Sequence, residues 1–97
     1  CERILDVPGI GFAEMGPGDL SLSLGYPRMP AHPLPPEMAA ARERIFKACR
    51  ERNIPFLESA TVETIGARLD EGVRVIAGGR EEIAKAGRAH SKRTMPV

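Results

Sequence analysis

The sequence predicts an α/β fold in which helices join parallel strands, and three observations support that prediction. The chain has 97 residues, 42% apolar and 28% charged, as in an ordinary globular domain. Short apolar runs alternate with helical patterns in the order strand, helix, strand, helix, strand, helix. The connections are short, which favours parallel strands with right-handed crossovers. Because so small a parallel sheet exposes two edges, we expect a piece of a larger α/β architecture, or a unit that partners complete.

The N-terminal part is expected to hold a helical turn, a strand and a long loop. Residues 2–7 have the pattern of a last helical turn, and residues 10–15 form an apolar run typical of a strand. The Gly-Pro-Gly-Asp sequence at 16–19 then predicts a tight turn. Residues 20–36 predict a proline-rich loop, because proline excludes regular helix and inner strand. Since the first residue is Cys rather than Met, we expect an N-terminus that is not the natural start.

A long helix is predicted from Pro36, since proline suits the first helical position. Asn53 is expected to end this helix in a left-handed conformation. Four residues recur at spacings of three and four and therefore share one apolar face: Met38, Ala41, Ile45 and Cys49.

The C-terminal half predicts two further strands, at residues 54–57 and 73–77. Between them, Thr61 is the expected N-cap of a helix that Gly72 ends. The residues expected to face inward from this helix are Val62, Ile65 and Leu69. A Gly-Gly turn and a last helix over residues 80–90 follow, and residues 91–97 are expected to form an extended tail.

Composition excludes several classes of function. The net charge is +1, and the basic residues after position 80 have no aromatic residues among them, so they predict a solvated segment and not a nucleic-acid surface. No apolar run approaches the roughly 20 residues of a membrane span, and no signal peptide is visible. The two cysteines, Cys1 and Cys49, form no metal-binding or disulfide pattern. We therefore expect a cytoplasmic protein without nucleic-acid or membrane partners.

The strongest candidate site is the loop Gly16–Asp19. In α/β folds, sites form where strands end, and two further loops of this kind are Glu58–Thr61 and Gly78–Glu82. Gly16 and Gly18 leave backbone N–H groups uncovered for an anion such as a carboxylate. Asp19 could bind a hard divalent cation through oxygen. The alternative is a plain tight turn in which Asp19 caps the following segment.

Other polar residues each have two interpretations. Glu58 could face the same pocket as Asp19 or be a solvated loop residue. Arg80, after two glycines, could mark an anion site or simply begin a helix. His32 is expected to anchor the loop by a hydrogen bond, and His90 to complement a helix dipole, rather than to act in catalysis.

Residues 7–33, "VPGIGFAEMGPGDLSLSLGYPRMPAHP", resemble the C-terminal third of the HpcH/HpaI aldolase/citrate lyase family, the metal-dependent pyruvate aldolases. The matching motifs begin with Val-Pro-Gly at 7–9 and Gly-Pro-x-Asp-Leu-Ser at 16–21. Ser-Leu-Gly at 23–25 and His-Pro at 32–33 complete them. The rest of the chain matches more loosely.

The resemblance implies that residues 1–97 are the last three β/α units of a (β/α)8 TIM barrel, in a homo-oligomer that is a trimer or hexamer. Asp19 would be one of two carboxylate ligands of Mg²⁺, Mn²⁺ or Co²⁺. The segment Gly16-Pro17-Gly18-Asp19 would bind substrate, and the amides of Gly18 and Asp19 would hold the carboxylate of pyruvate. Glu58 stands where relatives tend to have an apolar residue, and would favour a polar aldehyde.

By the same resemblance, the complete protein would be an aldolase that cleaves a 4-hydroxy-2-oxo acid to pyruvate and an aldehyde. The family's other metal-binding glutamate, its substrate-binding arginine and its catalytic histidine match no position here, so the isolated chain is expected to be inactive. Two alternatives stay open. One is a non-catalytic α/β module that self-associates and binds a small anion at Gly16–Asp19, and the other is a citrate-lyase-like carbon–carbon lyase.

Overall fold

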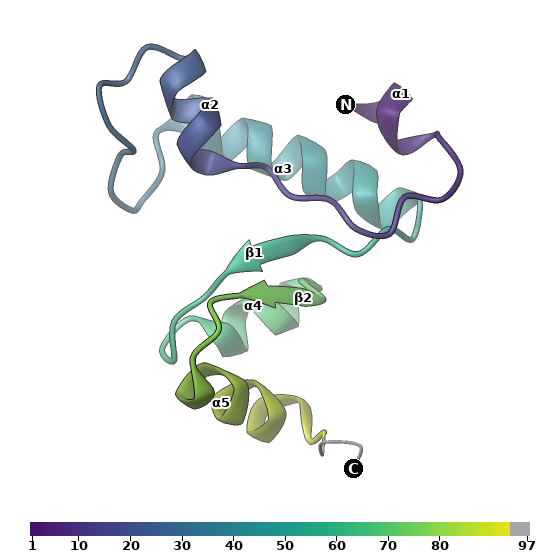
Figure 1. Cartoon of the computed structure of the whole chain (residues 1–97), viewed down its shortest axis with the longest axis vertical. Helices are drawn as coiled ribbons and strands as arrows, with labels where there is room; N and C mark the ends of the chain where they lie inside the picture. Colours follow the sequence, from purple (N-terminus) through teal and green to yellow (C-terminus); the bar gives the residue numbers. More distant parts are fainter. Residues whose placement is uncertain (94–97) are drawn as a thin grey trace. The chain divides into compact units, whose positions relative to one another are not determined.

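Two parallel strands confirm the α/β class (Figure 1). In the computed structural model, which describes residues 1–93, β1 (Leu57–Ser59) pairs in parallel with β2 (Val75–Ala77). The helices are α1 (Glu2–Leu5), α2 (Pro17–Ser23), α3 (Pro36–Glu51), α4 (Ile65–Glu71) and α5 (Glu81–Ser91). The chain divides into two compact units, Cys1–Ile54 and Pro55–Val97. The closed barrel stays a prediction.

Helix α3 forms the core of the first unit. It begins at Pro36 as predicted, because proline lacks the N–H that would otherwise stand unpaired in the first turn. Its buried residues are Met38, Phe46, Ala48 and Cys49. Phe46 and Ala48 widen the predicted apolar face, on which Ala41 and Ile45 are only half-buried. Burial raises the pKa of the Cys49 thiol, so this group behaves as a small hydrophobic side chain.

Ion pairs join the N-terminal segment to α3, against which α1 and α2 both pack. Arg44 donates from Nε and Nη2 to the Glu2 carboxylate at 2.8 and 2.9 Å, and Arg52 Nε donates to Asp6 at 2.7 Å. The hydrogen bond from the Arg44 guanidinium lowers the pKa of Glu2 to about 2. These pairs are exposed, so they orient α1 and add little to stability.

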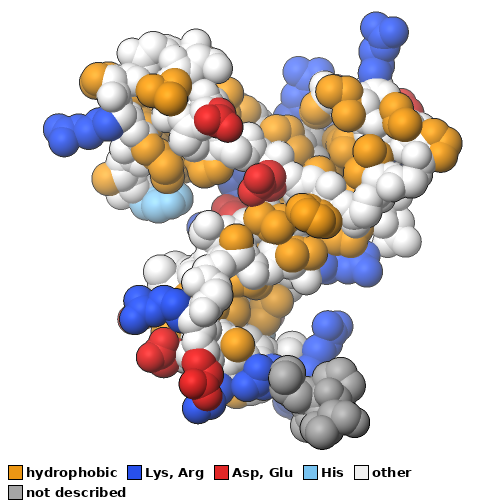
Figure 2. All heavy atoms as spheres, in the orientation of Figure 1, with side chains coloured by type: hydrophobic (Ala, Val, Ile, Leu, Met, Phe, Trp, Pro, Cys, Tyr) orange, Lys and Arg blue, Asp and Glu red, His pale blue; other side chains and the backbone are white. Residues whose placement is uncertain are grey.

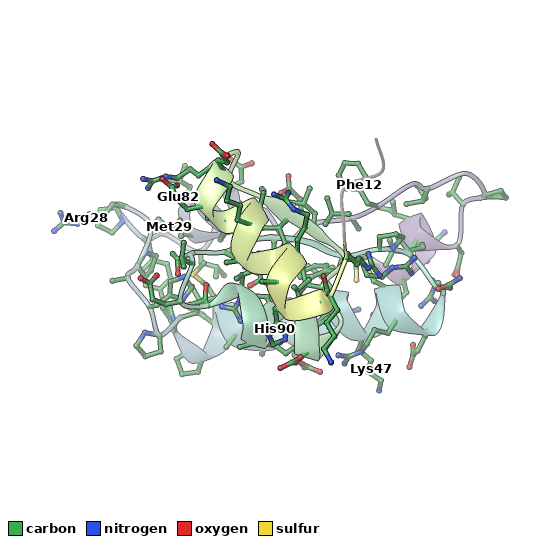
Figure 3. The ribbon with its side chains drawn as sticks, turned by 90° about the horizontal axis from the view of Figure 1, so that it is seen from below. Phe12, Arg28, Met29, Lys47, Glu82 and His90 are labelled. Atoms are coloured by element: carbon green, nitrogen blue, oxygen red, sulfur yellow. The ribbon has the colours of Figure 1, made fainter. Side chains whose placement is uncertain are left out.

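The predicted strand at residues 10–15 is wrong. Only Ala13 in this segment forms an isolated bridge, and the other residues are irregular. A strand exists only where a neighbouring strand satisfies its N–H and C=O groups along its length, and an apolar run alone does not supply that neighbour. The side chain of Phe12 is 56% exposed and lies on the outside of the ribbon (Figure 3).

The predicted tight turn at 16–19 and the start of the predicted loop at 20–36 are also wrong, because residues 17–23 form α2. Pro17 occupies the first turn of that helix, where proline is tolerated. The irregular segment is therefore confined to residues 24–35, which hold the prolines before α3. A cis peptide bond joins His32 to Pro33 within it.

The second unit is a β/α/β/α segment. The strand register pairs Leu57 with Val75, Glu58 with Ile76 and Ser59 with Ala77. Both strands are displaced from the predicted positions: β1 starts at the last residue of the predicted run 54–57, and β2 covers only the end of 73–77. Helix α4 connects the strands and packs against α5.

Helix α4 begins one turn later than predicted. Its N-cap is Thr64, and the residues of the preceding turn share hydrogen bonds: Thr61 N donates to Thr64 Oγ1 at 2.8 Å, and Thr64 N donates to Thr61 Oγ1 at 3.3 Å. Consequently Val62 lies outside the helix and is 48% exposed, which contradicts the prediction. Ile65 is buried as predicted, and Gly72 ends the helix at φ 106°.

The C-terminal helix α5 extends one residue into the predicted tail of 91–97, because it ends at Ser91. Residues 94–97 of that tail lie outside the described residues. Within residues 1–93, no helix is both long and apolar enough to cross a membrane.

Replacement of Phe46 by Ala is expected to destabilise the protein by about 3–5 kcal/mol, because Phe46 is 1% exposed and its loss leaves a cavity beside α3. The free energy of unfolding from urea titration followed by circular dichroism measures this loss. Phe12→Ala is the matched control, since Phe12 is 56% exposed and should change stability by about 0.5 kcal/mol or less. Equal losses in the two variants would contradict the assignment of α3 as the core.

Candidate functional site

The candidate site at Gly16–Asp19 is the first turn of α2. Gly16 is the N-cap, in a left-handed conformation with φ 64° and ψ 67° that an L side chain rarely adopts. Leu20 N donates to Gly16 O at 3.0 Å, which closes the first helical turn. The helix itself offers no acceptor to the N–H groups of its first turn, and no side chain caps them. Gly18 and Asp19 therefore present two adjacent backbone donors.

The Asp19 carboxylate lies at the same end of α2 as these donors. Its Oδ2 is 3.9 Å from the point where a Cβ on Gly16 would stand, so the side chain folds back toward the N-cap. Asp19 is exposed, and its carboxylate oxygens are hard ligands suited to a divalent cation. The structure thus brings together the four predicted residues Gly16, Pro17, Gly18 and Asp19, as a helix start and not as the tight turn predicted from sequence.

Ser21 stabilises this turn, although it was not predicted as a site residue. It is 0% exposed, and its Oγ donates to Gly18 O at 2.7 Å. A buried serine satisfied in this way holds the carbonyl of Gly18 in place, and with it the peptide that carries the Asp19 N–H. The Gly-Pro-x-Asp-Leu-Ser motif contains this serine, and that was the signal available in the sequence.

Glu58 was predicted to follow a strand, but in the structure it is the middle residue of β1. Its Oε1 is 3.7 Å from Arg68 Nε, and the Glu58 side chain is 19% exposed. Arg68 also pairs through Nη1 with Glu71 Oε1 at 3.1 Å. Glu58 therefore lies in a strand beside an arginine, and it is not a solvated loop residue. Because Asp19 belongs to the first unit and Glu58 to the second, a pocket shared by both stays a prediction.

The loops that follow β1 and β2 do meet, as parallel strands require. They border a shallow hollow of about 290 Å³, to which Thr61, Glu63 and Arg80 contribute. Arg80 is the N-cap of α5, and its Nε lies 3.6 Å from Glu82 Oε2, which agrees with the helix-start interpretation. The two strand-end loops of the second unit therefore lie close together.

The two histidines belong to different units and have different surroundings. His90 lies in the last turn of α5, the position expected for a complement to the helix dipole, and its Nε2 also lies 2.8 Å from Asp70 Oδ1, which links α5 to α4. His32 lies exposed in the loop before α3, and its hydrogen-bonding role stays a prediction. Within residues 1–93, no three His, Cys, Asp or Glu side chains converge to hold a metal ion. In that part of the chain, Asp19 therefore belongs to no such cluster, and its role as a metal ligand stays a prediction.

Comparison with known proteins finds a family whose sequence model covers most of the chain. The sequence model of the family described as HpcH/HpaI aldolase/citrate lyase matches residues 1–87. No curated protein and no solved structure matches the chain.

Gly16 and Gly18 should respond oppositely to replacement by Ala. Gly16→Ala is expected to cost roughly 1–2 kcal/mol of stability, because its φ of 64° is unfavourable for an L side chain. Gly18→Ala should raise stability by roughly 0.5–1 kcal/mol, since Gly18 is inside α2 and a Cβ there meets no atom within 4 Å. Urea unfolding of both variants measures the difference, and a cost at Gly18 equal to that at Gly16 would argue against this helix start.

Proposed function

The chain belongs to the HpcH/HpaI aldolase/citrate lyase family, and from this membership we propose that it is part of a metal-dependent aldolase that cleaves a 4-hydroxy-2-oxo acid to pyruvate and an aldehyde. The family is one of carbon–carbon lyases and is generally metal-dependent. The proposal of this particular substrate and of a metal is supported by the arrangement of the first turn of α2. There, two backbone donors and one exposed carboxylate lie side by side.

The backbone of this turn binds the substrate carboxylate in our proposal. The N–H groups of Gly18 and Asp19 donate to its two oxygens, as donors without a helical acceptor can. Gly16 has no side chain, so the N-cap residue itself does not cover these donors. Ser21 acts as a positioning residue, since its bond to Gly18 O fixes the peptide before Asp19. Fixed donors of this kind lose little free energy to reorganisation when charge develops on the bound substrate.

Asp19 fits the role of a metal ligand by its chemistry. Mg²⁺ and similar cations are held by one or two carboxylates together with substrate oxygens and water, and Asp19 offers one carboxylate beside the proposed substrate donors. When bound, the cation would polarise the 2-oxo group of the substrate as a Lewis acid. In this proposal the second carboxylate ligand comes from outside residues 1–93, because within these residues no three potential ligands converge.

The same proposal includes a complete (β/α)8 barrel and a homo-oligomer. Hydrophobic atoms are visible at the surface in Figure 2. The large hydrophobic side chains of the first unit that are well exposed are Ile4, Val7, Phe12, Leu22, Leu24 and Met29. Exposed apolar surface of this kind favours association with further chain or with other subunits. The two-stranded sheet β1–β2 likewise favours extension by further strands.

Glu58 is our proposed determinant of the aldehyde. Its carboxylate is held near Arg68, and a carboxylate in a pocket wall accepts hydrogen bonds from hydroxyl groups. We therefore propose a polar, hydroxylated aldehyde. A citrate-lyase-type reaction is the second candidate, because the description of the matched family includes citrate lyase.

Replacement of Asp19 by Asn in the full protein is expected to lower kcat/KM by at least about a hundredfold, because a ligand of the Lewis acid loses its charge. Binding of Mn²⁺, measured by calorimetry, should weaken in parallel. Asp6→Asn is the matched control: Asp6 is an exposed aspartate that pairs with Arg52, away from the α2 turn, and both readouts should stay unchanged.

Full activity and Mn²⁺ affinity in Asp19→Asn would contradict the assignment of Asp19. The absence of metal-dependent cleavage of any 2-oxo acid by the full wild-type protein would favour the non-catalytic, anion-binding alternative.

A further inference from the structure

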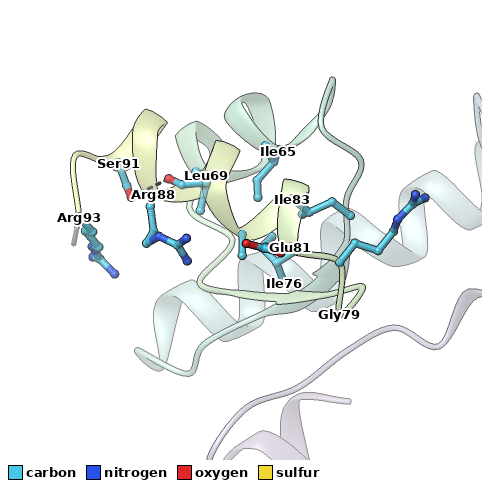
Figure 4. A pocket seen from close by; sticks show the side chains of 12 residues that line it. Ile65, Leu69, Ile76, Gly79, Glu81, Ile83, Arg88, Ser91 and Arg93 are labelled. Carbon is cyan, nitrogen blue, oxygen red and sulfur yellow. Dashed lines mark hydrogen bonds between the residues drawn. The ribbon is translucent and has the colours of Figure 1, made fainter. Parts of the chain in front are cut away.

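The second unit contains an apolar groove of about 700 Å³ that the proposed aldolase chemistry does not use (Figure 4). Its apolar lining comes from α4, β2 and α5: Ile65, Leu69, Ile76, Ile83 and Ala84. Arg88, Ser91 and Arg93 lie together at one end of the groove, and Gly79 lies toward the other. The groove therefore combines an apolar length with a polar, cationic end.

The end of helix α5 explains why two arginines meet there. Lys92 adopts a left-handed conformation at φ 56°, and the chain turns back so that Arg93 N donates to Arg88 O at 3.0 Å. This is the hydrogen bond of a Schellman motif, which places the residue two beyond the helix over the last turn. An apolar contact usually accompanies the motif. Here, the two residues that this hydrogen bond joins are both arginines, Arg88 and Arg93.

The same motif ends α3 and α4 with an apolar residue at the equivalent position. Ile54 N donates to Cys49 O at 2.9 Å after α3, and Val73 N donates to Arg68 O at 3.0 Å after α4. Val73 is 1% exposed, so this residue covers the core of its unit. Arg93 departs from that pattern, because it places a charge at the rim of an apolar groove.

Charge at the groove is unbalanced among the described residues. Glu81 lines the groove, but Lys85 Nζ neutralises it at 2.8 Å, and Arg80 pairs with Glu82 at 3.6 Å. Within residues 1–93, no carboxylate forms an ion pair with Arg88 or Arg93. Two neighbouring like charges repel each other, and an anion placed between them would be favoured. The helix C-terminus offsets only part of this repulsion.

We propose that this groove binds a small amphiphilic carboxylate, with its apolar chain along Ile65, Ile76 and Ile83 and its carboxylate between Arg88 and Arg93. Guanidinium groups bind carboxylates through paired N–H donors, which matches the head group to the cationic end. The volume falls within the roughly 300–1,000 Å³ of small-molecule sites, whose lining is likewise mostly apolar with a few polar groups. This proposal does not depend on the aldolase assignment, because it uses none of the residues of the α2 turn.

Octanoate is the probe for this site, followed by NMR of isoleucine methyl groups in the full protein. Ile65, Ile76 and Ile83 line the groove, whereas Ile4 and Ile45 belong to the first unit and report on non-specific binding. We expect octanoate to shift the three groove methyls in a saturable manner. Octanol lacks the carboxylate and acetate lacks the chain, so both should bind at least about tenfold more weakly.

Arg88→Gln and Arg93→Gln should each raise the Kd for octanoate about tenfold, as expected for loss of one charged hydrogen-bonding partner. Lys47→Gln is the matched control for net charge, because Lys47 is a 67% exposed cation on α3, and it should leave the Kd unchanged. Ala84→Phe keeps both arginines but fills the groove, and should abolish binding. Well-dispersed methyl spectra without ligand show that each variant folds, whereas Ala84→Phe itself is expected to shift the methyl signals of the groove.

Three results would overturn the proposal. The first is no saturable shift with octanoate, and the second is equal affinity for octanoate and octanol. The third is a set of shifts that includes Ile4 and Ile45 as strongly as the groove residues.

Discussion

Residues in the left-handed backbone conformation set the ends of the helices, and the other features of the chain depend on these positions. Gly16 begins α2, Asn53 follows α3, Gly72 ends α4 and Lys92 ends α5. Each of them turns the backbone through its positive φ, which glycine adopts without steric cost and which Asn53 and Lys92 also adopt here. Where Gly16 turns, the two donors and the carboxylate of the candidate site are exposed together. Where Lys92 turns, two arginines are brought to one groove.

The candidate site depends on local structure more than on a large core. The first turn of α2 is formed by the cap at Gly16, by Pro17 and by the buried hydroxyl of Ser21, all within six residues of sequence. Helix α3 provides the surface against which α2 packs. A local motif of this kind takes its geometry from neighbouring residues, although no three potential metal-ligating side chains converge within residues 1–93.

Glu58 shows how tertiary structure changes the meaning of a residue. In the sequence it follows an apolar run and resembles a loop carboxylate, whereas in the structure it is the central residue of a three-residue strand. Its partner Arg68 comes from α4, ten residues later in the chain, because the parallel crossover returns that helix to the strand. The proposed contact with an aldehyde therefore involves a carboxylate whose position an arginine already constrains.

The sequence by itself determined the features that arise from a few neighbouring residues: the start of α3 at Pro36, the left-handed residues Asn53 and Gly72, and the family motif around Asp19. These depend on backbone sterics, which are local. Only the tertiary structure decided that residues 10–15 form no strand, that β1 starts at the last residue of its apolar run, and that Ser21 is buried. Strand formation requires hydrogen-bonding partners, and burial requires covering side chains. Both are supplied by chain that is distant in sequence, so no local pattern encodes them.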